Sequence, residues 1–374
     1  RFAIGTEGAM GGVDVRISAF DPQSIEIRFF DEQGVDISEA RQRDIEKVYY
    51  QANFRRAFME EIGAIVFPPR VLEMYANSLL AELDVERLRR KRFRVVVDYA
   101  FGSASMIMPS IFGKIGCDVL SLNSFTDEKK VTLSQEELNS ALRDLSQLVK
   151  SSEAEIGVLM DNAGERLYLL DEQGRQIHPQ VTLVLFLKLL GETGRKGKIA
   201  VPVSISSQVE KIASAYGNGV VRTKVSRSDL MKASLQDDVI FAGAGSGGFI
   251  FPSFLPTYDA MASTAILLDS LSVLSRPLSE IVDELPRIHL LSEEIPASWD
   301  HKGLIMRRLV EELDDGRLEL IDGIKVFLDD ATWILVLPDP DEPSLHLICE
   351  SDDDTHAARV IGEYTKKIMD IVGG

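Results

Sequence analysis

The segment that decides the fold of this 374-residue chain reads GVLMDNAGERLYLLDEQG over residues 157–174. Its apolar start has the length of a buried strand, and the small residues 162–164 favour a tight loop before a second strand. Asp161 and Glu165 bracket this loop, and two carboxylates around a small-residue turn favour a hard metal ion. Arg166 follows directly and indicates a phosphate or carboxylate partner nearby.

Composition sets the broad class of protein. The length predicts roughly two to four domains of about 100–150 residues each. The hydrophobic fraction of 45% is typical of an ordinary globular protein. The formal net charge of −18 argues against a nucleic-acid partner and against an anionic membrane surface, because both attract positively charged proteins.

The two cysteines, Cys117 and Cys349, lie far apart in apolar surroundings, which favours a reduced, cytoplasmic compartment. No apolar run approaches the roughly 20 residues of a spanning helix, since the longest, at 181–190, is interrupted by Lys188. The chain starts at Arg1, without Met and without a hydrophobic signal peptide. We therefore expect it to begin partway through a larger protein.

A four-residue sequence, Asp-Glu-Gln-Gly, occurs twice, at residues 31–34 and 171–174, each time after a strand-like segment. Such an internal repeat implies two similarly built α/β domains. Residues 93–122 add the order strand, glycine-containing loop, helix and strand, which predicts a largely parallel sheet. We predict three tandem similar α/β domains with mixed sheets, the first of them truncated, followed by a smaller α+β domain. The predicted domains are residues 1–90, 91–178, 179–290 and 291–374.

Within the first domain, alternating apolar and polar residues predict strands over 11–18 and 25–30. Charged and apolar residues at helical spacing predict a helix over 37–59, and a second helix over 71–90 follows a pair of prolines. These elements leave the first domain smaller than a complete α/β unit.

The loop at 161–166 resembles the metal loop of the α-D-phosphohexomutases, the phosphoglucomutases and phosphomannomutases, whose motif reads Asp-Gly-Asp-Ala-Asp-Arg. Asp161 matches the first metal ligand, Glu165 replaces the third and Arg166 is kept. The resemblance implies Mg²⁺ at Asp161 and Glu165 and a substrate contact by Arg166. Ala163 stands in place of the second ligand, and because Mg²⁺ needs a near-octahedral set of oxygens, this loss is expected to weaken the site severely.

A second resemblance lies in the glycine-rich segment at 241–251. The family motif Gly-Glu-x-Ser-Gly-His, which grips the sugar hydroxyls, is matched at Gly243, Ser246 and Gly247, and the resemblance makes these three residues candidates for contact with the sugar. Alanine replaces the glutamate and glycine replaces the histidine. A tight hairpin is the alternative explanation for this density of glycine.

The catalytic serine and the phosphate loop of the family are also altered. Ser18 lies where the family has Thr-Ala-Ser-His-Asn-Pro, which makes it the candidate nucleophile, but His and Asn are absent and an ordinary strand-end serine is the alternative. The family's phosphate loop aligns without a gap with residues 337–346. There Asp339 and Asp341 would repel a phosphate, and Pro340 removes a backbone donor. We therefore expect no phosphate-binding residues in this loop.

Alterations in all four loops lead us to expect a catalytically inactive phosphohexomutase-like domain with a structural or regulatory role. The resemblance to the C-terminal part of mannose-1-phosphate guanylyltransferase-like proteins implies a sugar-nucleotidyltransferase domain in the same parent chain, acting in the synthesis of GDP-mannose or a related nucleotide sugar.

Two alternatives stay open. One is an active phosphomannomutase or phosphoglucomutase that moves phosphate between C1 and C6 of a hexose, and the other is a sugar-phosphate sensor without turnover. No cofactor is expected for the inactive domain, whereas an active mutase would need Mg²⁺. A hexose phosphate is the expected small-molecule partner, and assembly into a homo-oligomer is left open.

Overall fold

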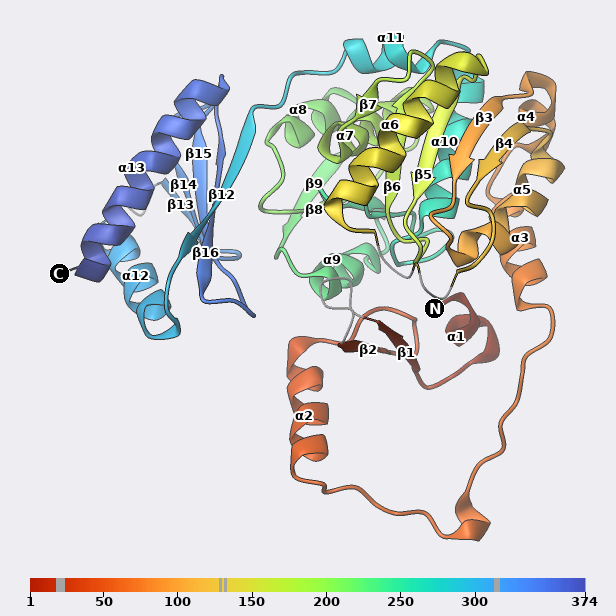
Figure 1. Cartoon of the computed structure of the whole chain (residues 1–374). Helices are drawn as coiled ribbons and strands as arrows, with labels where there is room; N and C mark the ends of the chain where they lie inside the picture. Colours follow the sequence, from red (N-terminus) through yellow and green to blue (C-terminus); the bar gives the residue numbers. More distant parts are fainter. Residues whose placement is uncertain (18–23, 128–129, 131–132, 313–316, 374) are drawn as a thin grey trace.

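The computed structural model describes residues 1–17, 24–127, 130, 133–312 and 317–373, and within them the chain forms four β-sheets (Figure 1). Helices accompany each of these sheets along the sequence. The predicted fold class, a mixed α/β architecture of several domains, is therefore confirmed.

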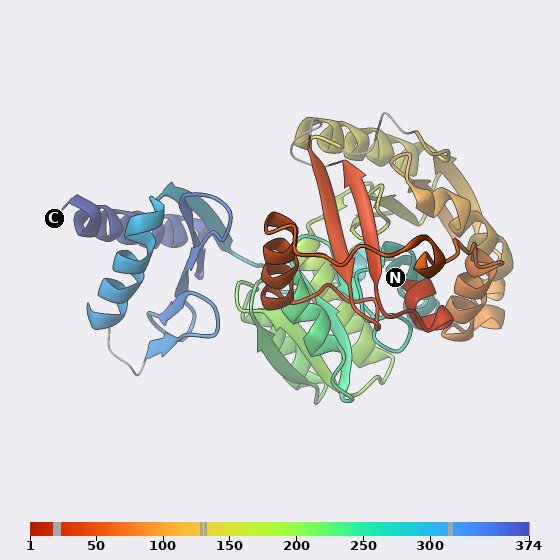
Figure 2. The same cartoon turned by 90° about the horizontal axis from the view of Figure 1, so that it is seen from below.

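The N-terminal region contributes an antiparallel pair of strands and two helices. Its elements are α1 (Phe2–Glu7), β1 (Gly12–Ile17), β2 (Ile25–Phe30), α2 (Glu39–Tyr50) and the short 3-10 helix η1 (Met59–Glu61). The pairing runs from Gly12 opposite Phe30 to Ile17 opposite Ile25. Figure 2 shows this strand pair lying across the body of the molecule.

The two strands have one apolar and one polar face, because successive side chains of a strand point to opposite sides. Val13, Val15, Ile25 and Ile27 are each more than half exposed to solvent. Arg28 points the other way and forms an ion pair within the molecule. The apolar side of this strand pair therefore faces water, and its polar side faces the rest of the chain.

Two helices have different bounds in the structure from those predicted from the sequence. The helix predicted over 37–59 ends at Tyr50, and none of its residues is buried. A helix without a packed apolar face has little to extend it beyond its own propensity. The helix predicted over 71–90 is divided in two because Asp84 caps a new helix, where its side chain accepts the N–H of Arg87 at 2.9 Å.

The second domain has the sheet order β4-β3-β5-β6-β7, with β3 parallel to β4 and β5 and the last two strands antiparallel. Its elements are α3 (Val71–Ala81), α4 (Val85–Lys91), β3 (Arg94–Asp98), η2 (Ser103–Met106), α5 (Met108–Ile115), β4 (Asp118–Leu122), α6 (Gln135–Ser151), β5 (Ile156–Met160), β6 (Leu167–Asp171) and β7 (Gln176–Ile177). The segment 157–174 thus forms a strand, a loop and a second strand, as predicted.

The third domain repeats this plan with the order β11-β10-β8-β9, in which β8 is parallel to β9 and β10 and β11 is antiparallel. Its elements are α7 (Pro179–Glu192), β8 (Lys198–Pro202), α8 (Gln208–Ala215), β9 (Gly219–Thr223), α9 (Arg227–Ser234), β10 (Val239–Gly243), β11 (Phe249–Ile250), α10 (Ala260–Leu274) and α11 (Leu278–Asp283). The apolar run at 181–190 forms most of α7, which is buried against β6, α8 and α10.

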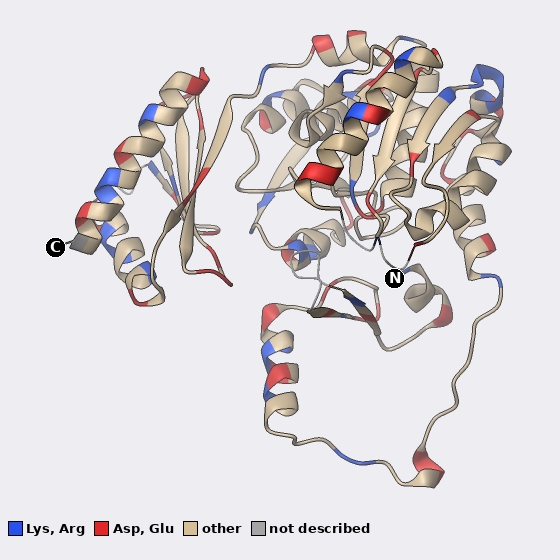
Figure 3. Ribbon diagram, viewed as in Figure 1, with Lys and Arg blue, Asp and Glu red and all other residues tan. Residues whose placement is uncertain are grey.

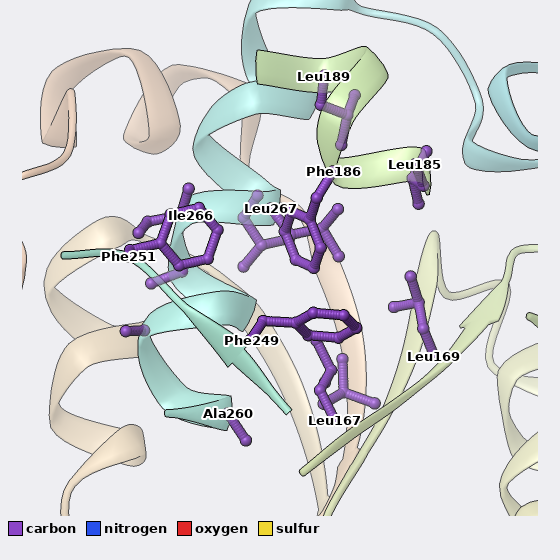
Figure 4. Packing of buried hydrophobic residues seen from close by; sticks show 14 of the residues in the cluster. Leu167, Leu169, Leu185, Phe186, Leu189, Phe249, Phe251, Ala260, Ile266 and Leu267 are labelled. Atoms are coloured by element: carbon purple, nitrogen blue, oxygen red, sulfur yellow. The ribbon is translucent and has the colours of Figure 1, made fainter. Parts of the chain in front are cut away.

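One hydrophobic core joins the second and third domains. The helix α10 packs against β5 and β6 of one sheet and β11 of the other. The ring of Phe186 lies 5.0 Å from that of Phe249 and 5.6 Å from that of Phe241, measured between centroids. Figure 4 shows Phe186 and Phe249 beside Leu169 of β6. Because both sheets contribute to this cluster, the two domains share their packing.

The fourth domain has a core of its own. Its sheet has the order β12-β16-β15-β14-β13, all antiparallel, with α12 and α13 packed against it (Figure 1). Its elements are β12 (Leu290–Pro296), α12 (Trp299–Glu312), β13 (Leu318–Glu319), β14 (Ile324–Phe327), β15 (Trp333–Pro338), β16 (Ser344–Glu350) and α13 (Asp354–Gly373). This arrangement is the predicted α+β module.

The two Asp-Glu-Gln-Gly sequences form the same turn. Asp31 and Asp171 each use one carboxylate oxygen to accept the N–H groups of the residues two and four positions later. Gly34 and Gly174 complete the turns with φ of 77° and 69°, a left-handed conformation that favours glycine. The repeat in sequence is therefore a repeat of local structure.

Among the described residues, no helix combines the length and the apolar character needed to cross a membrane. Acidic and basic side chains alternate along α2 and α13 (Figure 3). These two helices therefore do not account for the acidic excess of the chain.

Buried polar contacts attach the fourth domain to the third. Glu350 at the end of β16 accepts hydrogen bonds from Trp333 Nε1 (2.5 Å) and from the hydroxyl of Ser206. Lys325 on β14 donates to the carbonyl of Val203 (2.9 Å), and its Nζ lies 3.9 Å from the ring centroid of Trp333. Both charged side chains are almost fully buried, so the loss of either partner would leave a buried charge or polar group without a hydrogen bond.

The variant Lys325→Met tests this contact through pH. Burial, helped by the charge of Arg222, lowers the pKa of Lys325 from 10.5 to about 8. Between these values the unfolded chain holds a proton that the folded chain lacks, so the wild type gains stability relative to Lys325→Met as the pH rises from 8 to 10.5. We expect a gain of about 3 kcal/mol.

The measurement is urea unfolding followed by tryptophan fluorescence, because both tryptophans lie in the fourth domain. A stability difference that stays constant over this pH range would contradict the role given to Lys325.

Candidate functional site

The loop between β5 and β6 resembles the two Asp-Glu-Gln-Gly turns but is one residue longer, since the N–H of Asp161 donates to the carbonyl of Arg166, five residues on. The N–H of Gly164 donates to the carbonyl of Asp161 (2.9 Å), and Gly164 has a φ of 67°. Asp161 Oδ1 accepts the N–H of Glu165 (2.7 Å) and of Arg166 (3.0 Å). The carboxylate of Asp161 therefore does what the aspartates of the two Asp-Glu-Gln-Gly turns do, which is to hold the backbone donors of its own turn.

The surroundings of Asp161 also affect its charge. Burial raises the pKa of its carboxyl group, and the neighbouring charge of Glu165 acts in the same direction. The N–H groups of Arg166 and Glu165 oppose this rise.

Glu165 lies among three arginine side chains. Its Oε2 is 3.0 Å from Nη2 of Arg227, the first residue of α9. The same oxygen is 3.1 Å from Nη1 of Arg28 on β2, and Oε1 is 3.3 Å from Nη2 of Arg1. These ion pairs join the N-terminal strand pair, the 161–166 loop and the third domain at one carboxylate.

The arginines keep Glu165 ionised. Burial alone would raise its pKa, but the charges of the neighbouring arginines, that of Arg227 foremost, outweigh it and lower the pKa from 4.5 to about 2. Asp36 shares two of these arginines, at 2.7 Å from Arg1 and 3.5 Å from Arg227. Glu165 is therefore a charged carboxylate whose two oxygens are both engaged.

The sequence did not identify these arginines as site residues. Arg28 occupies a polar position of an alternating strand, and Arg227 follows a serine that caps a helix. The alternation of apolar and polar residues in this strand does not reveal which face meets the protein, because the exposure of the apolar face is visible only in the structure.

The residues of this loop do not fit a divalent metal ion. Mg²⁺ takes a near-octahedral set of oxygen ligands. Ala163 offers none, one oxygen of Asp161 holds two N–H groups, and both oxygens of Glu165 face guanidinium groups. Within the part of the chain that the structure describes, no group of three or more His, Cys, Asp or Glu side chains is placed to hold a metal. The metal site inferred at Asp161 and Glu165 is thus not supported by their geometry.

The glycine-rich segment packs against the same loop. The N–H of Leu167 donates to the carbonyl of Gly247 (2.9 Å), and a Cβ added at Gly247, whose φ is 92°, would lie 2.8 Å from the carbonyl oxygen of Leu167. A Cβ at Gly243 would lie 3.1 Å from the side chains of Leu183 and Phe249. Close packing therefore explains both glycines without a sugar.

Ser246 and Arg166 are the two candidate substrate residues whose side chains reach solvent. An antiparallel bridge joins Arg166 to Gly248, two positions after Ser246. The structure thus brings these two side chains to adjacent loops, next to Glu165 and its arginines.

The C-terminal loop holds a carboxylate of its own where the resemblance placed a phosphate. Asp339 Oδ1 accepts the N–H of Asp341 (2.8 Å) and of Glu342 (2.7 Å). Its Oδ2 lies 2.8 Å from Nε2 of His346, and this hydrogen bond leads the contacts that lower the pKa of Asp339. Lys302 Nζ donates to the carbonyls of Asp339 (2.6 Å) and Glu342. The backbone donors that could meet a bound anion are therefore already taken.

Ser18, the candidate nucleophile, falls at residues 18–23, outside the described residues. The described chain ends on one side at Ile17 of β1 and resumes at Ser24, just before β2. The role inferred for Ser18 from the resemblance therefore stays a prediction.

Two family models match this chain. The model of phosphoglucomutase/phosphomannomutase alpha/beta/alpha domain II matches residues 73–174, and the model of domain III matches residues 178–288. The chain belongs to the α-D-phosphohexomutase superfamily. The first match begins before the boundary predicted at residue 90, because it includes α3 and α4.

Relatives extend the similarity over nearly the whole chain. A "Probable phosphoglucosamine mutase" of Methanopyrus kandleri is 28% identical over 365 residues, which cover 96% of this chain and 79% of that protein. A phosphoglucomutase/phosphomannomutase family protein of Burkholderia thailandensis has the same fold, with a TM-score of 0.81 at 20% identity over 97% of this chain and 77% of its own.

Magnesium is present in one solved member of the superfamily. The N-acetylphosphoglucosamine mutase of Aspergillus fumigatus, in complex with GlcNAc-6P and magnesium, covers 80% of this chain and 69% of its own, with 12% identity and a TM-score of 0.54. This likeness concerns the fold, and it does not transfer the metal site to the present chain.

The expectation of an inactive domain attached to a sugar-nucleotidyltransferase was wrong. The sequence similarity to proteins named as phosphoglucosamine mutases extends over nearly the whole chain, and none of these relatives is named as a nucleotidyltransferase. The expectation rested on the altered residues of four loops taken together, whereas the similarity to mutases extends over nearly the whole sequence and favours the alternative of an active mutase.

The variant Glu165→Gln tests the arginine cluster. It leaves three cations around a neutral side chain, and we expect a loss of about 3 kcal/mol in the free energy of unfolding at pH 7. The pKa of Glu165 is about 2 in the folded chain against 4.5 ordinarily, so its contribution is fully present above pH 4.5 and is lost as the pH falls towards 2.

Urea unfolding at pH 7 and at pH 3 measures this loss. The matched control is Glu363→Gln, whose exposed pair with Arg359 at 3.9 Å should add no measurable stability. Equal losses in the two variants would show that the cluster does not stabilise the fold.

The variant Asp339→Ala tests the C-terminal loop. It removes the acceptor of the Glu342 N–H, and we expect hydrogen exchange of that amide to become roughly tenfold faster, as for the loss of one charge-assisted hydrogen bond. The control is Asp341→Ala in the same loop, whose exposed side chain should leave the Glu342 amide protected. Unchanged exchange in Asp339→Ala would contradict the assigned acceptor.

Proposed function

We propose that this chain is a phosphohexomutase that acts on a hexosamine phosphate and moves its phosphoryl group between the C1 and C6 oxygens. The observation that carries this proposal is the similarity to proteins named phosphoglucosamine mutase, which extends over 96% of the chain or more at 25–28% identity. A match confined to one domain would support only a shared fold.

The exposed side chains at the 161–166 loop are suited to a phosphosugar. Arg166 presents a guanidinium group with no ion-pair partner among the described residues, and such a group binds phosphoryl oxygens through paired N–H donors. Ser246 on the adjacent loop offers a hydroxyl for the sugar. The arginines around Glu165 lie behind this surface, where they pair with Glu165, Asp36 and Glu26.

Phosphoryl transfer depends mainly on position and on charge stabilisation. In the proposed reaction the bond from phosphorus to a serine oxygen breaks as the bond to a sugar oxygen forms, and the proton of the sugar hydroxyl passes to the serine oxygen. Ser18 is the residue of this chain proposed to carry the phosphoryl group between the two positions. Arg166 would hold the transferred group, and no step is assigned to a metal because the loop does not fit one.

A cytoplasmic location is part of this proposal. Cys117 and Cys349 are not joined to each other in a disulfide. Burial raises the pKa of each thiol to about 12, so that neither is a reactive thiolate near neutral pH. Two unpaired thiols of low reactivity suit a reducing compartment.

The test is a mutase assay followed by ³¹P NMR. The substrates are the 6-phosphates of glucosamine, glucose and mannose, each with the matching 1,6-bisphosphate, and we expect the highest kcat/KM for glucosamine 6-phosphate. Arg166→Ala should lower kcat/KM about 100-fold through the loss of a charge-assisted contact. Ser18→Ala should abolish turnover.

The control is Arg94→Ala, which removes an exposed arginine that pairs with Asp118 at 3.1 Å away from the site and should leave kcat/KM unchanged. Folded protein that converts none of the three sugars would overturn the proposed function, as would turnover that survives in Ser18→Ala. Binding of the sugars without turnover would overturn it equally.

A further inference from the structure

We propose that three arginine side chains take the position and the charge of a divalent cation at the 161–166 loop, so that this loop is built to work without a metal ion. The arrangement is present whether or not the chain turns over a substrate, and it therefore goes beyond the proposed function.

The geometry of Asp161 has a complete explanation without a metal. Like Asp31 and Asp171, Asp161 is followed three residues later by a glycine of positive φ, and its carboxylate accepts two backbone N–H groups, here those four and five positions later. In the other two turns the aspartate likewise holds the backbone of its own turn, and Asp171 also accepts from Nε of Arg175 (2.6 Å). A carboxylate oxygen already bound to two N–H groups has little capacity left for a cation.

Glu165 is neutralised from three directions. Guanidinium groups reach it from the start of the chain, from β2 and from the first turn of α9, with nitrogen to oxygen distances of 3.3, 3.1 and 3.0 Å. A dication placed against the same carboxylate would have to displace these groups and would be repelled by each of them. The site is therefore closed to Mg²⁺ by charge as well as by the missing oxygen at Ala163.

Each arginine is fixed by a second contact, so the cluster is organised in advance of any ligand. Arg28 Nε donates to Glu26 at 2.6 Å, and Arg1 Nη1 donates to the carbonyl of Gly34 at 3.0 Å. The guanidinium of Arg227 lies 5.0 Å from the ring centroid of Tyr258. The cationic charge at this position is therefore permanent, unlike that of an exchangeable ion.

Arg227 has hydrogen-bonding capacity to spare. Its Nε–H is buried and makes no hydrogen bond to any described residue, although Asp36 Oδ2 lies 3.5 Å away. Because this N–H is buried, the negative charge that the cluster stabilises is that of Glu165 and Asp36, as a cation at this position would do.

The first experiment measures metal binding to the complete wild-type chain. Calorimetric titration with MgCl₂ and with MnCl₂ should give no saturable heat up to 5 mM, about the range of a weak site. The thermal midpoint should be the same in EDTA and in about 10 mM MgCl₂. Saturable binding of one ion per chain that disappears in Glu165→Gln would overturn the proposal. Binding that is the same in Glu165→Gln would place the ion at another site, and the loop would then be metal-free as proposed.

The second experiment restores a metal site. The triple variant Ala163→Asp with Arg28→Ala and Arg227→Ala supplies the missing carboxylate and removes two competing cations, and MgCl₂ at about 10 mM should raise its thermal midpoint by roughly 3 °C or more. The matched control, Ala163→Asp with Arg94→Ala, keeps the cluster and should not respond. A folded triple variant without any response to Mg²⁺ would overturn the claim that the arginines hold the metal position.

These measurements are separable from the test of catalysis. Metal titrations need no turnover, so a chain without mutase activity can still confirm the arginine cluster, and an active chain can still refute it. If the triple variant does not fold, the titration of the wild type decides by itself.

Discussion

The ion pairs of Glu165 are the interaction on which the arrangement of this chain depends. The N-terminal strand pair forms a two-stranded sheet by itself, and it faces the second and third domains with its polar side. One carboxylate meets arginines from both sides of that junction. Burying a charge is costly unless it is paired, so the loop, the strand pair and α9 must adopt their observed positions together.

Apolar contacts complete the attachment without replacing these ion pairs. Phe2 packs edge-on against Tyr75 at 5.3 Å between ring centroids. Val35 is fully buried among residues of α9 and of the third sheet, including Leu230 and Met231. Non-directional packing of this kind adds stability, but the direction in which the strand pair faces is set by its charged side chains.

Much of the fold could be predicted from the sequence, because local patterns determined it. The run at 157–174 showed two strands and a turn, and the repeated Asp-Glu-Gln-Gly proved to be a repeated structure. The helix over 37–59 was overextended because helical spacing reveals an amphipathic face but not whether anything packs on it. The candidate site could be located only in part, since the partners of Glu165 come from residues 1, 28 and 227, and periodicity carries no information on contacts so distant in sequence.

The function was misjudged for a related reason. The sequence Asp-x-x-Gly occurs in all three turns, so the surviving letters of a motif do not reveal whether its aspartate binds a metal or only holds the turn. Altered residues at a loop show that its chemistry has changed, and they do not show that it has ended. Here guanidinium groups from other elements of the fold surround Glu165, and such contacts are visible only in three dimensions.

The apolar outer face of β1 and β2 gives this region two opposite responses to its solvent. Dissolved salt screens the charges that hold the inner, polar face. Strongly hydrated salts such as sulfate favour the removal of apolar surface from water, and so promote contact through the outer face. The strand pair can therefore either stay attached within one molecule or associate with another molecule through its exposed apolar face, which includes Val13, Val15, Ile25 and Ile27. The ionic composition of the medium sets the balance between the two.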